Sequence, residues 1–235
     1  MSLMTLMGAG APANNAMVES LRVDLAGYWK LEEAAGTRFD SSPQAADLTE
    51  NGGPGNAPGV IGDCVSLDGT TQYLSRPTDA NIEVGDFDFE WWGWVNFNAL
   101  GDQEVMSKYG GVGDGFLLDL SAFLGDQLLF QGYNTGVSIG FVTNGAALSA
   151  STWYFFDCWH DSVANTVNMR VDNGATQSAA TILPGTDSGD AFGLGARASA
   201  PSLYVNGLID EVGFRKGSLL TDPQRAALFA LTVPY

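Results

Sequence analysis

The chain has 235 residues, of which 45% are hydrophobic and 16% charged, a composition typical of a globular domain rather than a disordered one. Asp and Glu number 27 against 10 Lys and Arg, so the formal net charge is −17. This balance argues against nucleic acid and anionic membranes as partners, because both require a basic surface. Spare carboxylates instead suit calcium, and 30 glycines with 9 prolines indicate many turns between short strands.

The first twenty residues are expected to form an extended N-terminal arm. They mix small, apolar and polar side chains, and Gly8, Gly10 and Pro12 interrupt regular structure. The segment lacks the basic start and the long apolar run of a secretory signal. Nor does any later stretch approach the roughly 18 consecutive apolar residues of a membrane helix. We therefore expect an arm over 1–20, a single domain over 21–235 and no membrane-spanning segment.

From Leu21 the sequence changes to short runs in which apolar and polar residues alternate, the pattern of half-buried strands. Their spacing and the turns between them predict an all-β fold, a two-sheet antiparallel β-sandwich. One short C-terminal helix is also predicted, because Thr221 offers an N-cap, Pro223 suits the first turn and 224–231 have helical spacing. The predicted strands are 25–32, 64–69, 71–76, 88–97, 103–109, 115–120, 127–133, 137–142, 153–161, 166–173, 191–196 and 207–215.

The cysteines and the single histidine carry no catalytic signature. Cys64 and Cys158 are far apart and lack the CxxC spacing of a zinc site, and the sequence leaves open whether they form one bridge. His160 is accompanied by no nucleophile motif, so we interpret it as a structural residue.

Several segments in order resemble a known superfamily. They read GYWKLEEAAGTRFDSS at 27–42, GVIGDCVSLDGTTQYLSRP at 59–77, FEWWGWVNF at 89–97, STWYFFDCWHDSVANTVNMRVDNG at 151–174 and NGLIDEVGFRKGSLLTDPQRAALF at 206–229. The chain resembles the concanavalin A-like lectin/glucanase superfamily, and within it the laminin-G-like domains that are also similar to pentraxins. The resemblance implies a jelly roll in which the first and last strands are adjacent. It implies less about activity, since the fold hosts lectins, glycosidases and structural modules.

The resemblance also implies a calcium ion held by Asp40, in the FDSS segment, and Asp210, in the LIDEV segment. Calcium prefers six to eight oxygen ligands, and one bound ion would tie the ends of the domain together. The alternative is that Asp40 caps a turn beside Ser41 and Ser42 while Asp210 accepts backbone hydrogen bonds.

The run Asp86, Asp88, Glu90, Trp92 and Trp94 places carboxylates and indoles on one face of a strand. Indoles stack on sugars, so we interpret Trp92, Trp94, Asp88 and Glu90 as a candidate ligand-binding set. Laminarinase-type glycosidases of this fold carry a Glu-x-Asp-x-Glu motif on one strand, but here the first carboxylate, Asp86, is one methylene shorter. The alternative is that the strand belongs to the core, with Trp92 or Trp94 covered by a neighbouring loop.

The strong fold resemblance and the degraded catalytic motifs favour a non-enzymatic structural or binding module. Stand-alone modules with such an arm resemble structural proteins of tailed bacteriophages. We therefore predict a virion-surface protein, a capsid decoration or fibre component, whose arm binds other protein subunits of the virion. One alternative is a carbohydrate-binding module that binds glycans at a cell surface, which would make the protein extracellular. The other is a glycoside hydrolase.

Overall fold

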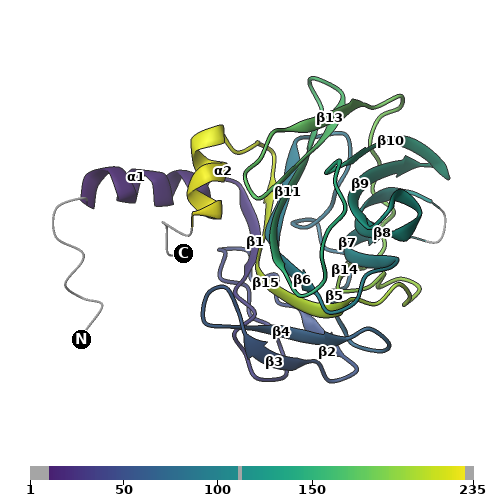
Figure 1. Cartoon of the computed structure of the whole chain (residues 1–235). Coiled ribbons are helices and arrows are strands. Elements are labelled where there is room, and N and C mark those ends of the chain that lie inside the picture. Colours follow the sequence, from purple (N-terminus) through teal and green to yellow (C-terminus); the bar gives the residue numbers. More distant parts are fainter. Residues whose placement is uncertain (1–10, 111–112, 231–235) are drawn as a thin grey trace.

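The computed structural model describes residues 11–110 and 113–230, which form a β-sandwich of two antiparallel sheets with two helices outside it (Figure 1). Sheet 1 has eight strands. In spatial order it contains β13 (Gln177–Ala180), β12 (Thr166–Val171), β11 (Trp153–Asp161), β6 (Phe89–Phe97), β15 (Asn206–Lys216), β4 (Asp63–Asp68) and β3 (Gly55–Pro58), with β1 (Leu25–Trp29) paired to β15.

Sheet 2 has seven strands and packs face to face against sheet 1. In spatial order it contains β10 (Val137–Thr143), β9 (Gln127–Asn134), β8 (Gly115–Ser121), β7 (Gln103–Tyr109), β14 (Phe192–Leu194), β5 (Tyr73–Arg76) and β2 (Thr49–Asn51). A single 3-10 turn, η2 (Ala122–Leu124), joins β8 to β9. The two sheets confirm the expected all-β sandwich, and the pairing of β1 with β15 confirms that the first and last strands are adjacent.

All twelve predicted strands are present, and three short strands were not predicted. The three are β2, β3 and β13, which contain polar, small or proline residues that are mostly exposed. Because hydrophobic alternation is the sequence signal of a strand, an edge strand without a buried face leaves no such signal. These strands are held by backbone hydrogen bonds to β5, β4 and β12.

The main core lies between the sheets and is built by alternation along the strands. On β6, Phe89, Trp91, Val95 and Phe97 face sheet 2 and are almost fully buried. Aromatic rings dominate the contacts, as in the stacking of Trp29 on Phe192 with ring centroids 5.5 Å apart. This burial is the main stabilising term of the fold, because each large side chain removed from water contributes roughly 2 to 3 kcal/mol.

The two cysteines are buried and unpaired. Cys158 lies in the main core, and Cys64 is equally inaccessible on β4. Burial raises the pKa of the Cys64 thiol to about 12, so it stays protonated. Both thiols therefore act as small apolar side chains, and the bridge that the sequence left open is not formed.

Helix α1 (Ala11–Arg22) corrects the expectation of an extended arm over 1–20, of which residues 1–10 lie outside the described range. Pro12 lies in the first turn, where proline is tolerated, and neither glycine nor proline follows it in the helix. Met17, Val18 and Leu21 have helical spacing and pack on the outer face of sheet 1. The mixture of apolar and polar residues in this segment thus has helical spacing, and the helix packs on its own domain.

Helix α2 (Asp222–Phe229) confirms the predicted C-terminal helix. The side chain of Gln224 accepts the N–H of Thr221 at 2.7 Å, which is one half of a capping box, and proline follows in the first turn. Leu228 and the preceding Leu220 are buried against the same face of sheet 1 that α1 covers. Figure 1 shows both helices on one side of the sandwich, with sheet 2 on the opposite side.

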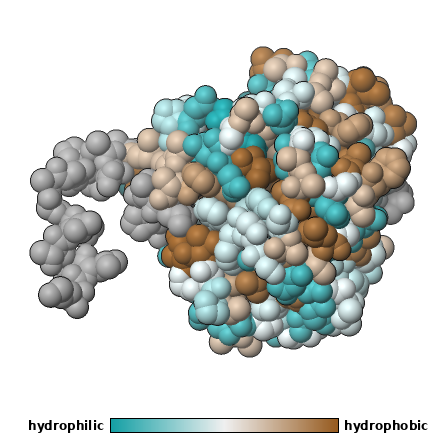
Figure 2. All heavy atoms as spheres, viewed as in Figure 1, coloured by the Kyte–Doolittle hydropathy of each residue, from teal (hydrophilic) through white to brown (hydrophobic). Residues whose placement is uncertain are grey.

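Among the described residues, no helix is both long and apolar enough to cross a membrane. On the side of the molecule seen in Figure 2, hydrophobic residues form separate patches between hydrophilic ones.

Candidate functional site

Asp40 caps the turn that follows β1. Its Oδ1 accepts the backbone N–H groups of Tyr28 and Ser42 at 2.8 and 2.7 Å. Its Oδ2 accepts the Ser42 hydroxyl at 2.6 Å and the Ala46 N–H at 2.7 Å. These four bonds give Asp40 the turn-capping role that was the alternative to calcium binding.

Asp210 is fully buried and holds the loop that precedes β4. Its Oδ2 accepts the N–H groups of Val60 and Ile61 at 2.7 and 3.0 Å. Burial raises the pKa of Asp210 to about 6, against the opposing effect of these backbone hydrogen bonds. The next residue, Glu211, is also buried, accepts the Tyr28 hydroxyl, and has its pKa raised to about 7 by burial.

The two carboxylates as placed do not form a calcium shell. N–H and O–H donors point at both oxygens of Asp40 and at one oxygen of Asp210, where a cation would need free oxygens. Within 11–110 and 113–230, no group of three or more His, Cys, Asp or Glu side chains is arranged to hold a metal. Calcium binding by Asp40 and Asp210 stays a prediction.

Trp92 and Trp94 lie under the two helices rather than on the surface. Their exposed fractions are 1% and 8%, and they belong to a second apolar cluster between sheet 1 and α1 and α2. Trp94 stacks on Phe229 of α2 at 5.7 Å and contacts Phe155 of β11 at 5.3 Å. The side chains do alternate as expected, but both tryptophans are core residues covered by neighbouring segments. This burial argues against the ligand-binding interpretation of Trp92 and Trp94.

Glu90 is fully buried and anchors α2 to sheet 1. Its two oxygens accept Nε and Nη2 of Arg225 at 2.8 and 3.0 Å, and the N–H of Leu220 at 2.7 Å. Asp157 Oδ2 lies 3.0 Å from the same Nε, and the guanidinium sits 3.9 Å from the ring of Trp159. Burial, then the nearby Glu90, raises the pKa of Asp157 well above its ordinary value. Two carboxylates thus share one cation, and Glu90 does not face a ligand.

The remaining acids of the run have local partners. Asp88 accepts the N–H and hydroxyl of Ser162 at 3.0 and 2.9 Å. Asp86 is exposed and lies 3.6 Å from Nε2 of His160, which is buried against Phe116. Because Asp86, Asp88 and Glu90 serve separate contacts, they do not form the open carboxylate pair that a glycosidase uses. The structural interpretation of His160 agrees with its burial.

A second group of polar side chains lies on the outer face of sheet 2, which neither helix covers. Glu104 of β7 stands directly opposite Asp119 of β8. Tyr109 of β7 and Tyr133 of β9 are both opposite Gly115 of β8, where a Cβ would collide with the backbone oxygen of Lys108. Their rings approach to 4.9 Å and are half-exposed.

Arg197 joins these residues from a distant loop. Its Nε and Nη2 donate to Glu104 Oε2 at 3.1 and 2.8 Å, and its guanidinium lies 4.7 Å from the ring centre of Tyr109. The loop can reach this position because β14 carries Gly193, where a Cβ would collide with the backbone of Ala196 and Ala198. We name Glu104, Ser107, Tyr109, Asp119, Tyr133 and Arg197 the Arg197 site.

Three buried polar atoms of the Arg197 site have no partner at hydrogen-bonding geometry. They are Glu104 Oε1, Ser107 Oγ and Asp119 Oδ1. The Ser107 hydroxyl is close enough to favour the charged form of Glu104, yet burial outweighs it and raises the pKa of that carboxyl. Burial and then Glu104 raise the pKa of Asp119 well above its ordinary value. Buried polar atoms normally have partners, and a bound ligand or water is one way to supply them here, as it is at Asp157 beneath α2, whose two oxygens also lack a hydrogen bond.

The Arg197 site combines the chemistry that proteins use for polyhydroxylated ligands. Tyr109 and Tyr133 supply half-exposed aromatic surface, and the carboxylates accept hydrogen bonds from hydroxyl groups. A further half-exposed aromatic pair, Tyr73 and Tyr204, lies in edge contact at 6.0 Å on β5 and the loop after Arg197.

Sequence reasoning missed the Arg197 site because its members come from four distant segments. The signal that was available is the polar content of the predicted strand 103–109, where Glu104 and Ser107 occur in a run that must be largely buried. No motif, however, connects that strand to Arg197 in its remote loop.

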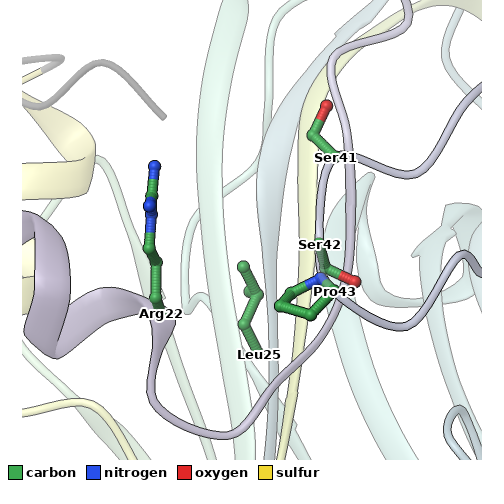
Figure 3. A pocket seen from close by; sticks show the side chains of 5 residues that line it. All are labelled: Arg22, Leu25, Ser41, Ser42 and Pro43. Atoms are coloured by element: carbon green, nitrogen blue, oxygen red, sulfur yellow. The ribbon is translucent and has the colours of Figure 1, made fainter.

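A separate pocket of about 240 Å³ lies where α1 meets the turn capped by Asp40 (Figure 3). Figure 3 shows Leu25 between Arg22 on one side and Pro43 on the other, with Ser41 and Ser42 completing the lining. The pocket offers hydroxyls and one cation but no aromatic surface, so it is a poorer match to a sugar than the Arg197 site.

No protein-family model matches the chain, and no curated protein matches its sequence. Solved structures do share its fold. The binding domain of paraclostridial mosquitocidal protein 1 superposes with a TM-score of 0.73 and 14% identity, covering 90% of this chain and 53% of that one. The binding domain of botulinum neurotoxin DC in complex with SialylT gives 0.67 and 12%, covering 90% and 52%. The chain therefore spans about half the length of these toxin domains.

A third similar structure is matched over nearly its whole length. Domain 4 of AbnA, an extracellular GH43 arabinanase from Geobacillus stearothermophilus, was solved in complex with arabinotriose. Its TM-score is 0.64 with 17% identity, covering 87% of this chain and 98% of that domain. At these identities the matches show the fold alone, a two-sheet jelly roll, and confirm that part of the resemblance seen in the sequence.

Proposed function

We propose that this protein is a glycan-binding module whose ligand lies on the outer face of sheet 2, at the Arg197 site. The observation that carries the proposal is the position of Arg197, which pairs with Glu104 and stacks on Tyr109 beside Tyr133. Buried acceptors without partners lie next to half-exposed aromatic rings, and sugars present hydroxyl donors beside apolar ring faces.

The similar structures support this proposal through their ligands. Domain 4 of the arabinanase was solved with arabinotriose, and the neurotoxin binding domain was solved with SialylT. We accordingly propose binding without turnover, at a cell surface or in a polysaccharide context. Release of reducing ends from a bound polysaccharide would contradict binding without turnover.

A glycan array with matched variants tests the proposal. Tyr133→Ala and Arg197→Met remove the aromatic surface and the cation, and we expect each to weaken binding at least tenfold. Phe39→Ala is the control, because Phe39 is an aromatic residue with 60% of its surface exposed outside the Arg197 site. A flat array for the wild-type protein, or equal binding by all four proteins, would contradict the proposal.

The virion-surface role and the subunit partners of the arm stay predictions. Their structural basis is weaker, because Met17 and Val18 of the arm pack on the domain itself and are not free to anchor it elsewhere. Removal of residues 1–20 would also expose the apolar face that these side chains cover. Assembly tests of the arm should therefore truncate only residues 1–10.

A further inference from the structure

The charge of the Arg197 site bears on the class of glycan it would bind. The charged groups acting on Asp119 are Glu104, Arg197 and Asp102, so three carboxylates face one cation. The cation is already engaged, since two of its nitrogens donate to Glu104 Oε2. Burial opposes the charge of Arg197, but Glu104 and then Asp119 outweigh it and raise its pKa, so the guanidinium stays paired with acids of its own chain.

The unpartnered atoms of the site are acceptors or hydroxyls. Glu104 Oε1 and Asp119 Oδ1 can only accept hydrogen bonds when ionised, and Ser107 Oγ can do either. Glu104 and Ser107 have no solvent exposure, whereas Asp119, Tyr109 and Tyr133 are partly exposed and are the groups that a ligand on this face can contact. A ligand that hydrogen-bonds to the carboxyl of Asp119 when that group is ionised must present O–H or N–H donors rather than a carboxylate.

Resting on the proposed glycan-binding function, we propose that the Arg197 site selects uncharged glycans, such as neutral hexose or pentose chains, and rejects glycans that carry sialic acid or uronic acid. Neutral sugars can donate hydroxyl hydrogen bonds to Asp119 while Tyr109 and Tyr133 contact the apolar face of the sugar ring. A carboxylate on the ligand would meet these acids without a free cation, and like charges brought together in a partly buried site oppose binding. The net charge of −17 acts in the same direction at longer range.

Paired probes test the proposal on the intact protein. Affinities are measured by calorimetry for galactan against polygalacturonate, for N-acetyllactosamine against its sialylated form, and for arabinotriose as a further neutral probe. We expect at least one neutral probe to bind, and its acidic counterpart to bind at least tenfold more weakly. The ratio of neutral to acidic affinity should narrow severalfold in Asp119→Asn, which replaces the ionisable carboxyl with an amide of nearly the same shape. It should be unchanged in Asp63→Asn, since Asp63 is an exposed acid on sheet 1.

The experiment distinguishes failure of the selectivity from failure of the proposed glycan-binding function. If acidic probes bind as well as their neutral counterparts, or better, the selectivity is contradicted while the glycan-binding function stands. If Asp119→Asn and Asp63→Asn change the ratio equally, the discrimination comes from overall charge and not from the Arg197 site. If no probe of either kind binds, the proposed function itself is contradicted.

Discussion

The outer faces of the two sheets differ in what covers them. On sheet 1, α1 and α2 cover an aromatic surface that includes Trp92 and Trp94, and Arg225 forms ion pairs with Glu90 and Asp157 beneath α2. On sheet 2, Tyr109 and Tyr133 are half-exposed, and neither helix covers them. One face is therefore covered by helices of the same chain, and the other is open to a ligand.

This difference separates residues that stabilise the fold from residues that are available for function. A rich aromatic strand such as β6 suggests a sugar-binding surface, yet its apolar area is used to dock two helices. The face with fewer aromatic residues is the functional candidate because its tyrosines and Arg197 are partly exposed and no helix covers them. Changes on the covered face should therefore cost stability, and changes on the other face should cost binding.

The largest effect is expected from Arg225→Met. The substitution leaves Glu90 and Asp157 buried without their shared cation, and removal of one partner from a buried ion pair costs about 3 to 5 kcal/mol. Urea denaturation measures the change in the free energy of unfolding. Arg22→Met is the control, because 52% of that side chain is exposed and the change should stay below roughly 0.5 kcal/mol. Equal stabilities of the two variants would show that the ion cluster does not hold α2.

Trp94→Ala should cost almost as much, about 3 to 5 kcal/mol, because it leaves a cavity beneath α2. Tyr133→Ala, on the half-exposed face, should cost only about 1 kcal/mol. Affinity should show the reverse order, with glycan binding lost in Tyr133→Ala and retained by the folded fraction of Trp94→Ala. If Trp94→Phe, a milder change, weakened binding more than Tyr133→Ala did, the roles of the two faces would be exchanged.

A pH dependence of stability should follow from Asp210 and Glu211. Burial raises their pKa values to about 6 and about 7, so the folded protein keeps protons that the unfolded chain releases near pH 4. The contribution of these two groups to the free energy of unfolding is therefore greatest at acidic pH and is lost as the pH rises through 7. Between pH 5 and pH 8 we expect the free energy of unfolding to fall by roughly 2 to 4 kcal/mol.

The variant Glu211→Gln isolates the larger part of this effect. It cannot ionise, so its stability should change less between pH 5 and pH 8 than that of the wild type. Glu19→Gln, at a side chain with 73% exposure, should follow the wild-type curve. A Glu211→Gln variant with the full wild-type pH dependence would contradict the assignment.

The smallest effect is expected from calcium. Backbone and hydroxyl donors already occupy the oxygens of Asp40 and one oxygen of Asp210, so chelation should shift the Tm by less than about 1 °C. A larger calcium-dependent rise in Tm that is lost in Asp40→Asn would instead confirm the site implied by the sequence resemblance.

The fold could be predicted from the sequence because apolar and polar residues alternate along a strand that has one buried face. The alternation in β6 predicted both the strand and the two faces that Phe89 and Trp92 occupy. The same pattern could not show which face stays open, since that depends on where α1 and α2 dock. The Arg197 site was unpredictable for a related reason, because Arg197 meets Glu104 only through the contact of a loop with β7, and such non-local pairings leave no local signal.

The most direct test of the central claim is to map a bound glycan by NMR. The tightest-binding neutral glycan is titrated into the isotopically labelled protein, and backbone amide shifts are followed. We expect the largest changes at Glu104, Tyr109, Asp119, Tyr133 and Arg197, with little change in α1 and α2. Shifts concentrated in the helices and at Trp94, with the outer face of sheet 2 unaffected, would contradict it.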